Sequence, residues 1–318
     1  MVLEIVKSFN LEPVSFKKHK SYFLCNTKNK TYVLKKVDYG YKDIILANNI
    51  KSFLVKNNFE NIDVFYKNYK NMPYQTYNEN NYILTDLIED ECINYNNEKI
   101  FLEFIQTLSK MNNKLKKTYL TSKSSECLIL NYSNSLKRIV QIKKYIHKQS
   151  KISEFDVLFL KKNNEYIEEI QNTIEFLQNT TYEKHKKIAI ENKSISHNNL
   201  KKEFIIHSQN KIYITSFFET TNNYHFTDLV SAILSYVDNC KNPISISKIL
   251  DIYIKHNNLE NEEIKIIYAM LNYPYKFIKI CNKFYSKKMN YVPNYILNKF
   301  QKTIERKEFL KNYIKKIE

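Results

Sequence analysis

The 318-residue sequence contains a single glycine, Gly40, and this scarcity excludes a common type of nucleotide-binding loop. Loops that cradle phosphates need glycines, because only a residue without a side chain lets backbone N–H groups approach the phosphates closely. Gly40 follows the first apolar alternating segments instead of lying between them. We therefore expect no glycine-rich loop over a nucleotide.

Arginine is also scarce: Arg138 and Arg306 are the only two in a chain with a formal net charge of +17. Such a charge favours a polyanionic partner, because clustered lysines gain free energy by releasing counterions from a phosphate backbone. Lysine, however, lacks the planar fork with which arginine recognises bases and phosphates. The richness in Lys, Asn, Ile and Tyr also matches the codon bias of a low-GC genome. We expect no specific nucleic-acid function and retain a lysine-rich polyanion-binding module as an alternative.

Long apolar runs and paired cysteines are missing too. No stretch approaches the roughly 18 apolar residues that span a bilayer, and the N-terminal segment lacks the apolar core and cleavage site of a signal peptide. The five cysteines include no Cys-x-x-Cys pair, and the histidines show no metal-binding spacing. We expect a protein synthesised in the cytoplasm, with buried thiols, no membrane segment and no metal site.

The apolar periodicity predicts a small β-rich lobe at the N-terminus. Residues 14–27 and 31–37 alternate like two strands, residues 42–58 have helical spacing, and residues 63–69 and 80–88 predict two more strands. We therefore predict a first lobe, residues 1–88, with one sheet and one helix.

The second predicted lobe, residues 89–318, is mostly helical. A strand, a loop and a strand pair are predicted between residues 194 and 221, in "SISHNNLKKEFII" and "KIYITSFFETT". No linker or repeat separates the lobes, so we predict a single two-lobed α+β unit. The predicted helices cover residues 97–117, 134–149, 154–179, 225–239, 245–257, 261–272 and a basic tract from residue 293.

This layout is that of a kinase-like phosphotransferase, in which ATP lies between the lobes and Mg²⁺ bridges its phosphates. The chemistry requires a strand lysine, a catalytic-loop carboxylate, and Asn and Asp ligands for the metal. The lysine is Lys35, with Lys36 as the alternative on the opposite face of the strand. The following helix offers Asp43 and no glutamate as a partner for it.

The predicted catalytic loop lacks its acidic residue. It should read His-x-Asp-x-x-x-x-Asn, and the segment that begins at His197 places Asn199 at the base position and Phe204 at the metal-ligand position. An amide is no base at neutral pH, and a general base typically contributes about 10² to 10⁴-fold to the rate.

The predicted metal strand lacks its acidic residue as well. Ser216 stands where an Asp should precede a Phe, and Phe218 follows two residues later. The Mg²⁺ site thus loses its anionic ligands. Glu203 or Glu219 could substitute in a shifted register, which leaves an active small-molecule phosphotransferase with a displaced metal site as an alternative.

These segments resemble the CotS-type spore coat proteins of endospore-forming bacteria, which are similar in fold to aminoglycoside phosphotransferases and choline kinases. The C-terminal motif is the most specific, although Ile278 stands where Trp is common. The segment into the hinge, between the lobes, lacks the usual glycine. The motifs that carry the resemblance over most of the chain are "YVLKKV", "YILTDLIEDEC", "ISHNNLKKEFII", "IYITSFF", "HFTDLVSAI" and "LNYPYKFIKICNKFYSKK".

The resemblance implies a kinase-like fold in which Asp228 anchors the lower lobe. It would place Lys35 and the hinge residues Asp86, Leu87 and Ile88 at a nucleotide. Because the carboxylates are missing, we predict a catalytically inactive pseudokinase that acts as a structural and interaction component of the spore coat, with no ATP or magnesium cofactor. It would be made in the mother cell and assembled with other coat proteins. The degenerate catalytic positions are His197, Asn199, Phe204, Ser216 and Phe218.

Overall fold

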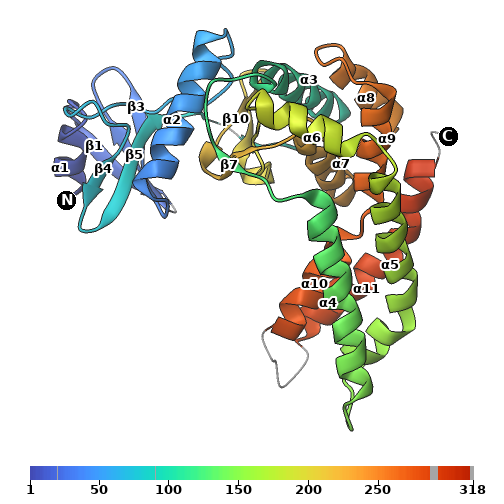
Figure 1. Cartoon of the computed structure of the whole chain (residues 1–318). Coiled ribbons are helices and arrows are strands. Elements are labelled where there is room, and N and C mark those ends of the chain that lie inside the picture. The colour runs from blue at the N-terminus through green and yellow to red at the C-terminus, as the bar shows by residue number, and fades with distance from the viewer. Residues whose placement is uncertain (20, 90, 287–292, 316–318) are drawn as a thin grey trace. The chain divides into compact units, whose positions relative to one another are not determined.

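The computed structural model divides into two compact units (Figure 1). The lobe boundary predicted at residue 88 is a different division and stays a prediction. The structure describes residues 1–19, 21–89, 91–286 and 293–315. The first unit comprises residues 1–124, 189–243 and 251–257, and the second comprises residues 125–188, 244–250 and 258–318.

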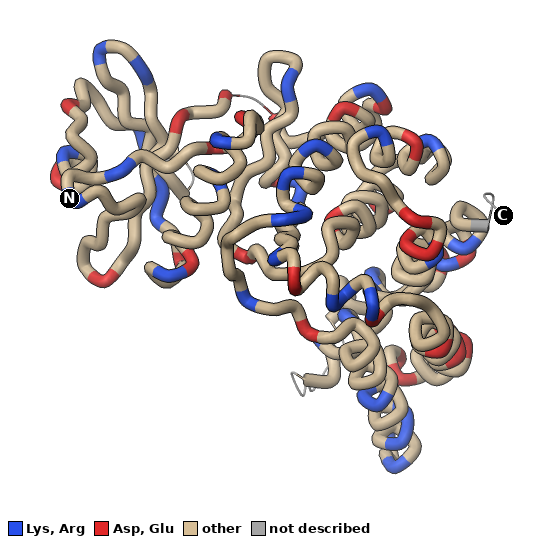
Figure 2. Tube along the Cα trace, turned by 45° about the horizontal axis from the view of Figure 1, so that its top comes forward, with Lys and Arg blue, Asp and Glu red and all other residues tan. Residues whose placement is uncertain are grey.

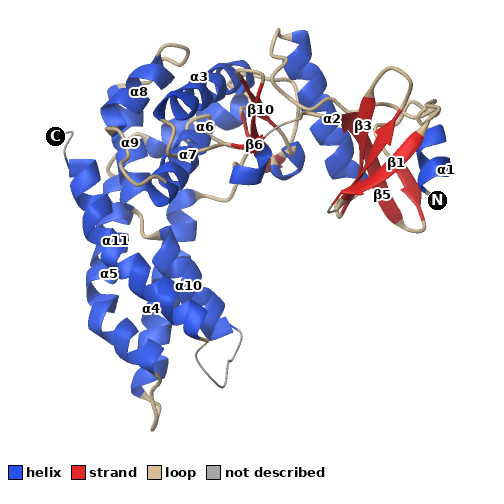
Figure 3. Ribbon diagram, turned by 180° about the vertical axis from the view of Figure 1, so that it is seen from behind, coloured by secondary structure: helices blue, strands red, loops and turns tan. Residues whose placement is uncertain are grey.

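The first unit contains an antiparallel five-stranded sheet in the order β1-β2-β3-β5-β4 (Figure 3). The single strand predicted at residues 14–27 is wrong, because two paired strands occupy it. The strand predicted at residues 63–69 is also wrong, since that segment forms only an isolated bridge between Phe65 and Thr85. The strands are β1 (Ser15–His19), β2 (Tyr22–Asn26), β3 (Thr31–Val37), β4 (Gln75–Tyr77) and β5 (Asn80–Asp86).

The turn between β4 and β5 explains why sequence signals missed this hairpin. Its two residues, Asn78 and Glu79, both have positive φ, at 44° and 62°. Two-residue hairpin turns of this type normally use Asn-Gly or Asp-Gly, because φ > 0 is costly for a residue with a Cβ. In a chain with one glycine, other residues adopt these angles, and the usual turn signal disappears.

Two helices pack against the five-stranded sheet. The helix α1 (Val2–Lys7), which the sequence analysis did not predict, buries Ile5 and Val6 against Leu34 and Leu84 on one face. The helix α2 (Tyr41–Lys56) lies on the other side of the sheet in Figure 3 and confirms the predicted helix at residues 42–58. It ends before Asn58, whose φ of 60° terminates the helix.

The rest of the first unit is built around α3 (Glu98–Leu115), the longest helix that lies wholly within it. Two small three-stranded sheets, in the orders β10-β9-β6 and β7-β11-β8, carry the predicted catalytic segments. The remaining elements are β6 (Glu91–Cys92), β7 (Lys123–Ser124), β8 (Ile195–Ser196), η1 (Lys202–Phe204), β9 (Ile205–Ser208), β10 (Lys211–Ile214), η2 (Phe217–Glu219), β11 (Thr221–Asn222) and α7 (Thr227–Asn239).

The second unit is helical. The hydroxyl of Ser153 accepts from the Asp156 N–H, and the Asp156 carboxylate accepts in return, so a capping box starts α5. The structure adds α6 and α10, which were not predicted, and the last two residues of the motif that ends in "FYSKK" lie outside the described residues. The helices are α4 (Leu128–His147), α5 (Glu154–Gln178), α9 (Asn261–Asn272), α10 (Tyr275–Ser286) and α11 (Asn294–Lys315); α6 (Tyr182–Glu191) and α8 (Ile246–Ile254) contribute residues to both units.

None of the helices in the described ranges is both long and apolar enough to cross a membrane.

Candidate functional site

A buried carboxylate holds the backbone of the predicted catalytic loop. Asp228, on the first turn of α7, is 1% exposed, and its two oxygens accept the backbone N–H groups of His197 at 2.8 Å and Asn198 at 2.9 Å. Burial raises the pKa of Asp228 to about 6, while the two N–H donors oppose the shift. Asp228 therefore anchors the loop through its backbone.

The imidazole of His197 is a second fixed point of the loop. Its Nε2 lies 2.8 Å from the carbonyl oxygen of Thr215, and its Nδ1 accepts the Asn199 N–H at 3.3 Å. A carbonyl oxygen can only accept, so Nε2 carries the hydrogen and the ring is neutral. Burial lowers the pKa of His197 to about 4, while the hydrogen bond to the Thr215 carbonyl opposes the shift and the nearby Lys51 charge adds to it. This histidine is therefore a structural connection between the loop and the next strand.

The two chemical positions predicted for the loop are Asn199 and Phe204. Asn199 is 6% exposed, and its side-chain nitrogen is buried with no hydrogen-bond partner in the described ranges. Phe204 is half-buried at the end of η1, and its carbonyl oxygen accepts the Thr215 N–H at 2.9 Å. The structure thus brings the predicted loop and the predicted metal strand together.

Ser216 follows Thr215 in a left-handed backbone conformation, with φ 66° and ψ 61°. A residue other than Gly costs of order 1 kcal/mol or more in this region, so the surrounding structure must hold it there. Its hydroxyl, the Asn199 amide and the Phe204 ring offer no anionic oxygen. They do not fit Mg²⁺, which prefers carboxylates and water. In the part of the chain that the structure describes, no three His, Cys, Asp or Glu side chains form a group that could hold a metal.

The two glutamates that could replace the missing ligands do not approach Asn199 in any hydrogen bond of the described residues. Glu203 is exposed. The Glu219 carboxylate accepts the Tyr39 hydroxyl at 3.0 Å. Burial first, and this hydrogen bond second, raise the pKa of Tyr39 to about 12.

Lys35 on β3 lies at the loop and not at an acidic partner. Its Nζ is 6.0 Å from the centroid of the Phe204 ring, and Lys201 Nζ is 5.6 Å from the same centroid. Asp43 instead forms an ion pair with Lys123 at 2.9 Å. Lys35 is half-buried, whereas the alternative, Lys36, is exposed.

A second buried charge at this site, Lys51 on α2, was not predicted from the sequence. It is 1% exposed, and its Nζ lies 2.6 Å from Asp63 Oδ1 and 3.7 Å from the centroid of the Phe65 ring. Burial lowers the pKa of Lys51 to about 8 despite the Asp63 charge. Helical periodicity places Lys51 beside the buried Ile50 and Leu54, but lysine is so frequent in this chain that no single one stands out.

An aromatic stack lies directly after Ser216. The Phe218 ring, 7% exposed, stacks on Tyr39 at 4.4 Å and on Phe65 at 5.8 Å between centroids. Phe217, fully buried, packs edge-on against His197 at 4.7 Å and lies 5.7 Å from Lys51 Nζ. Apolar rings thus surround the segment that would deliver a metal ligand.

The predicted hinge residues have separate contacts. The Asp86 carboxylate pairs with Lys30 Nζ at 2.5 Å and accepts the Tyr66 hydroxyl at 2.6 Å. Leu87 and Ile88 are half-buried. Among the described residues, no hydrogen bond or ion pair connects these three to the predicted catalytic loop.

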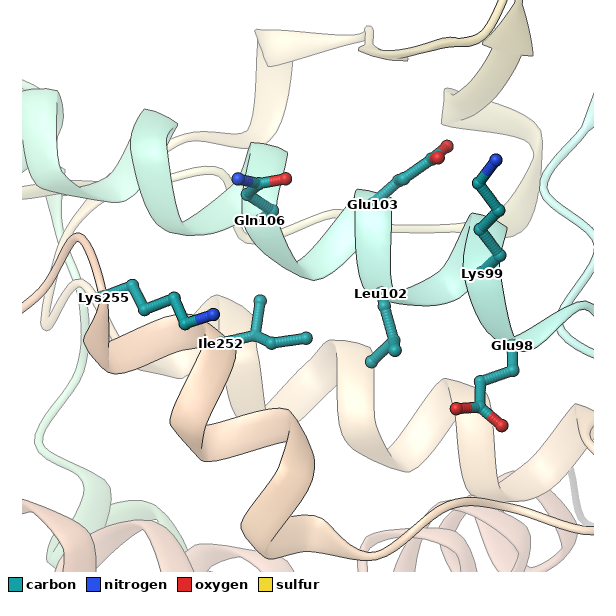
Figure 4. Close-up of a pocket in the computed structure, with 7 residues that line it drawn as sticks. All are labelled: Glu98, Lys99, Leu102, Glu103, Gln106, Ile252 and Lys255. Atoms are coloured by element: carbon teal, nitrogen blue, oxygen red, sulfur yellow. The ribbon is translucent and has the colours of Figure 1, made fainter.

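A surface pocket of about 460 Å³ lies elsewhere in the first unit, between α3 and α8 (Figure 4). Leu102 and Ile252 supply its apolar part, while charged side chains of both signs stand at its rim (Figure 4). None of the predicted site residues lines it. Its full lining is Glu98, Lys99, Leu102, Glu103, Gln106, Ile252 and Lys255.

Comparison with known proteins agrees with this architecture. Residues 3–317 match the family described as "Spore coat putative kinase YutH". An aminoglycoside phosphotransferase from Alicyclobacillus acidocaldarius is similar in structure, with a TM-score of 0.88 and 12% identity over 98% of this chain and 94% of that chain. An AMP-bound spectinomycin phosphotransferase has a TM-score of 0.68 and 12% identity, over 98% of this chain and 96% of that chain. A choline kinase from Cryptosporidium parvum has a TM-score of 0.56 and 12% identity, over 94% of this chain and 90% of that chain.

At such identities these solved structures establish the fold alone, and they confirm the predicted two-lobed kinase-like class. No curated protein sequence matches the chain.

Proposed function

The chain belongs to this spore coat kinase-like family, and from that premise we propose that it is a catalytically inactive member that serves as a structural and interaction component of the endospore coat. The observation that carries the proposal is a catalytic loop with an ordered backbone and no carboxylate at its chemical positions. Asp228 and His197 hold the loop, whereas Asn199 and Ser216 offer an amide and a hydroxyl.

The missing groups have a large expected effect on rate. Without a general base the barrier rises by roughly 3 to 5 kcal/mol, and without anionic ligands the magnesium that neutralises the phosphates is not held. The stack of Tyr39 on the buried Phe218, which also stacks on the buried Phe65, further supports loss of ATP and magnesium binding. Other coat proteins are the proposed partners, and the mother-cell cytoplasm is the proposed site of synthesis.

Calorimetric titration with ATP, with and without Mg²⁺, tests the inactive state. We expect no magnesium-dependent heat from the wild-type protein. The matched variant Asn199→Asp/Phe204→Asn/Ser216→Asp restores the three groups on the same backbone and should gain magnesium-dependent binding. Micromolar, magnesium-dependent ATP binding by the wild type would refute the proposal and favour a phosphotransferase with a displaced metal site.

A further inference from the structure

Charge is distributed unevenly among the helices of the second unit. The helices α4 and α10 contain no Asp or Glu, whereas the neighbouring α5 contains six. Figure 2 shows this asymmetry as blue segments along α4 and red segments on α5. The six acidic residues of α5 are Glu154, Asp156, Glu165, Glu168, Glu169 and Glu175.

Three lysines lie along one exposed line of α4 and its C-terminal cap residue. Lys137, Lys144 and Lys148 are exposed and follow one another at spacings of seven and four, which places them on one line along the helix. The opposite side of α4 buries Ile139 and Ile146. At about 1.5 Å per residue, the line of lysines is about 16 Å long.

Two further side chains border this line. Arg138 is exposed, and Tyr145 is 56% exposed with its ring edge-on to Tyr285 of α10, 6.5 Å away. Among the described residues, no ion pair involves Lys137, Arg138, Lys144 or Lys148. The α4 basic face, defined as Lys137, Arg138, Lys144, Tyr145 and Lys148, therefore combines unneutralised charge with an accessible aromatic ring.

The neighbouring helix extends the positive region. α10 contacts α4 through the hydrogen bond between the hydroxyls of Tyr132 and Tyr275, 2.6 Å apart. Its exposed charged residues are all lysines: Lys276, Lys279 and Lys283. A partner bound at the α4 basic face would therefore meet no acidic side chain from either helix.

We propose that the α4 basic face docks an acidic, Asp- and Glu-rich segment of a partner protein. The proposal rests on the interaction role given above and names the surface and the chemistry of the partner. Lysines are flexible point charges that suit carboxylates at varied spacings, and an exposed aromatic ring is typical of protein interfaces. A second copy of the chain is disfavoured as the occupant, because each copy carries a formal charge of +17.

Fluorescence anisotropy of the full chain with a synthetic probe tests this docking. The probe is a fluorescein-labelled helical peptide with Glu at every third or fourth position among alanines. The variant Lys137→Gln/Lys144→Gln/Lys148→Gln should bind it about tenfold more weakly, because exposed ion pairs are individually weak and a tenfold loss corresponds to about 1.4 kcal/mol shared among three pairs. Tyr145→Ala should weaken binding about threefold.

A matched variant removes the same charge elsewhere. Lys28, Lys67 and Lys211 are exposed lysines of the first unit, and their replacement by Gln should change the affinity less than about twofold. Equal losses in the two triple variants, or no binding by the wild type, would overturn the proposal. So would a single-stranded oligonucleotide of equal charge that binds the same face more tightly than the peptide. Phosphotransfer by the protein would refute its inactivity without changing this result.

Discussion

His197 and Asp228 are buried neighbours. Each should make the free energy of unfolding depend on pH, and the two contributions should have opposite signs. The unfolded chain binds the histidine proton near pH 6.5, whereas the folded protein binds it only near pH 4. His197 therefore contributes stability above pH 6.5 that is lost as the pH falls through 4. One pKa unit corresponds to about 1.4 kcal/mol, so the complete loss is about 3 kcal/mol.

Asp228 acts in the opposite direction. Its folded pKa of about 6 lies above the ordinary value of 3.8, so the folded protein takes up this proton first. Protonation relieves the cost of burying the carboxylate, and stability is gained as the pH falls from 6 to 3.8, again by about 3 kcal/mol in full. In the wild type these two contributions nearly cancel.

Single variants separate the two contributions. His197→Gln keeps a donor for the Thr215 carbonyl and removes the titration. As the pH falls from 7.5 to 4.5, its free energy of unfolding should therefore rise by about 2.5 kcal/mol relative to that of the wild type. Over the same range, the free energy of unfolding of Asp228→Asn should fall by about 2 kcal/mol relative to that of the wild type. The exposed His147→Gln is the control for replacing a histidine outside the loop.

Urea unfolding, followed by far-UV circular dichroism because the chain has no tryptophan, measures these differences at each pH. A difference between wild type and His197→Gln that stays constant from pH 7.5 to 4.5 would refute the neutral, buried state of this histidine. A constant difference for Asp228→Asn would refute the raised pKa of the carboxyl group.

Two further variants test the surroundings of the loop. Phe218→Ala removes a ring stacked on two others and should lower the free energy of unfolding by about 3 kcal/mol. The control Phe176→Ala, at a 42% exposed residue, should lower it by less than about 1 kcal/mol in the same urea unfolding experiments. Burial lowers the pKa of Lys51 from 10.5 to about 8, so between these pH values the unfolded chain holds a proton that the folded protein has lost. The free energy of unfolding of the wild type should therefore rise by about 3 kcal/mol relative to that of Lys51→Met as the pH rises from 8 to 10.5. The exposed Lys56→Met is the control, and a difference that does not vary between pH 7.5 and 10 would contradict the burial of the Lys51 charge.

The elements with strong periodicity were predictable from the sequence. Their apolar residues recur every three or four positions over several turns, as in α2, α3 and α5, and this pattern needs no tertiary information. The hairpin between β1 and β2 was missed because residues 15–26 contain neither Gly nor Pro. The helix α1 was missed because six residues are too short to show a helical period.

Only part of the site could be read from the sequence. The loop positions follow from fixed spacings after His197, so Asn199 and Phe204 could be found by counting. The contacts of Lys51 with Asp63, and of Tyr39 with Phe218, join residues that are distant in the sequence or on different elements. No local pattern encodes such pairs, and frequent Lys, Tyr and Phe hide them further.

The residues that hold the catalytic loop are not the residues that would perform chemistry on it. Asp228 binds two backbone N–H groups and His197 connects a carbonyl to another N–H, so these contacts do not depend on the side chains at positions 199, 204 and 216. A substitution such as Asp to Asn at position 199 would therefore remove a base while the backbone keeps its course. Loss of Asp228, in contrast, would leave two backbone donors unpaired, and the buried N–H of His197 alone would cost about 1 to 3 kcal/mol. Under the proposed inactive role, this difference in cost explains how a kinase-like loop persists without carboxylates at positions 199 and 216.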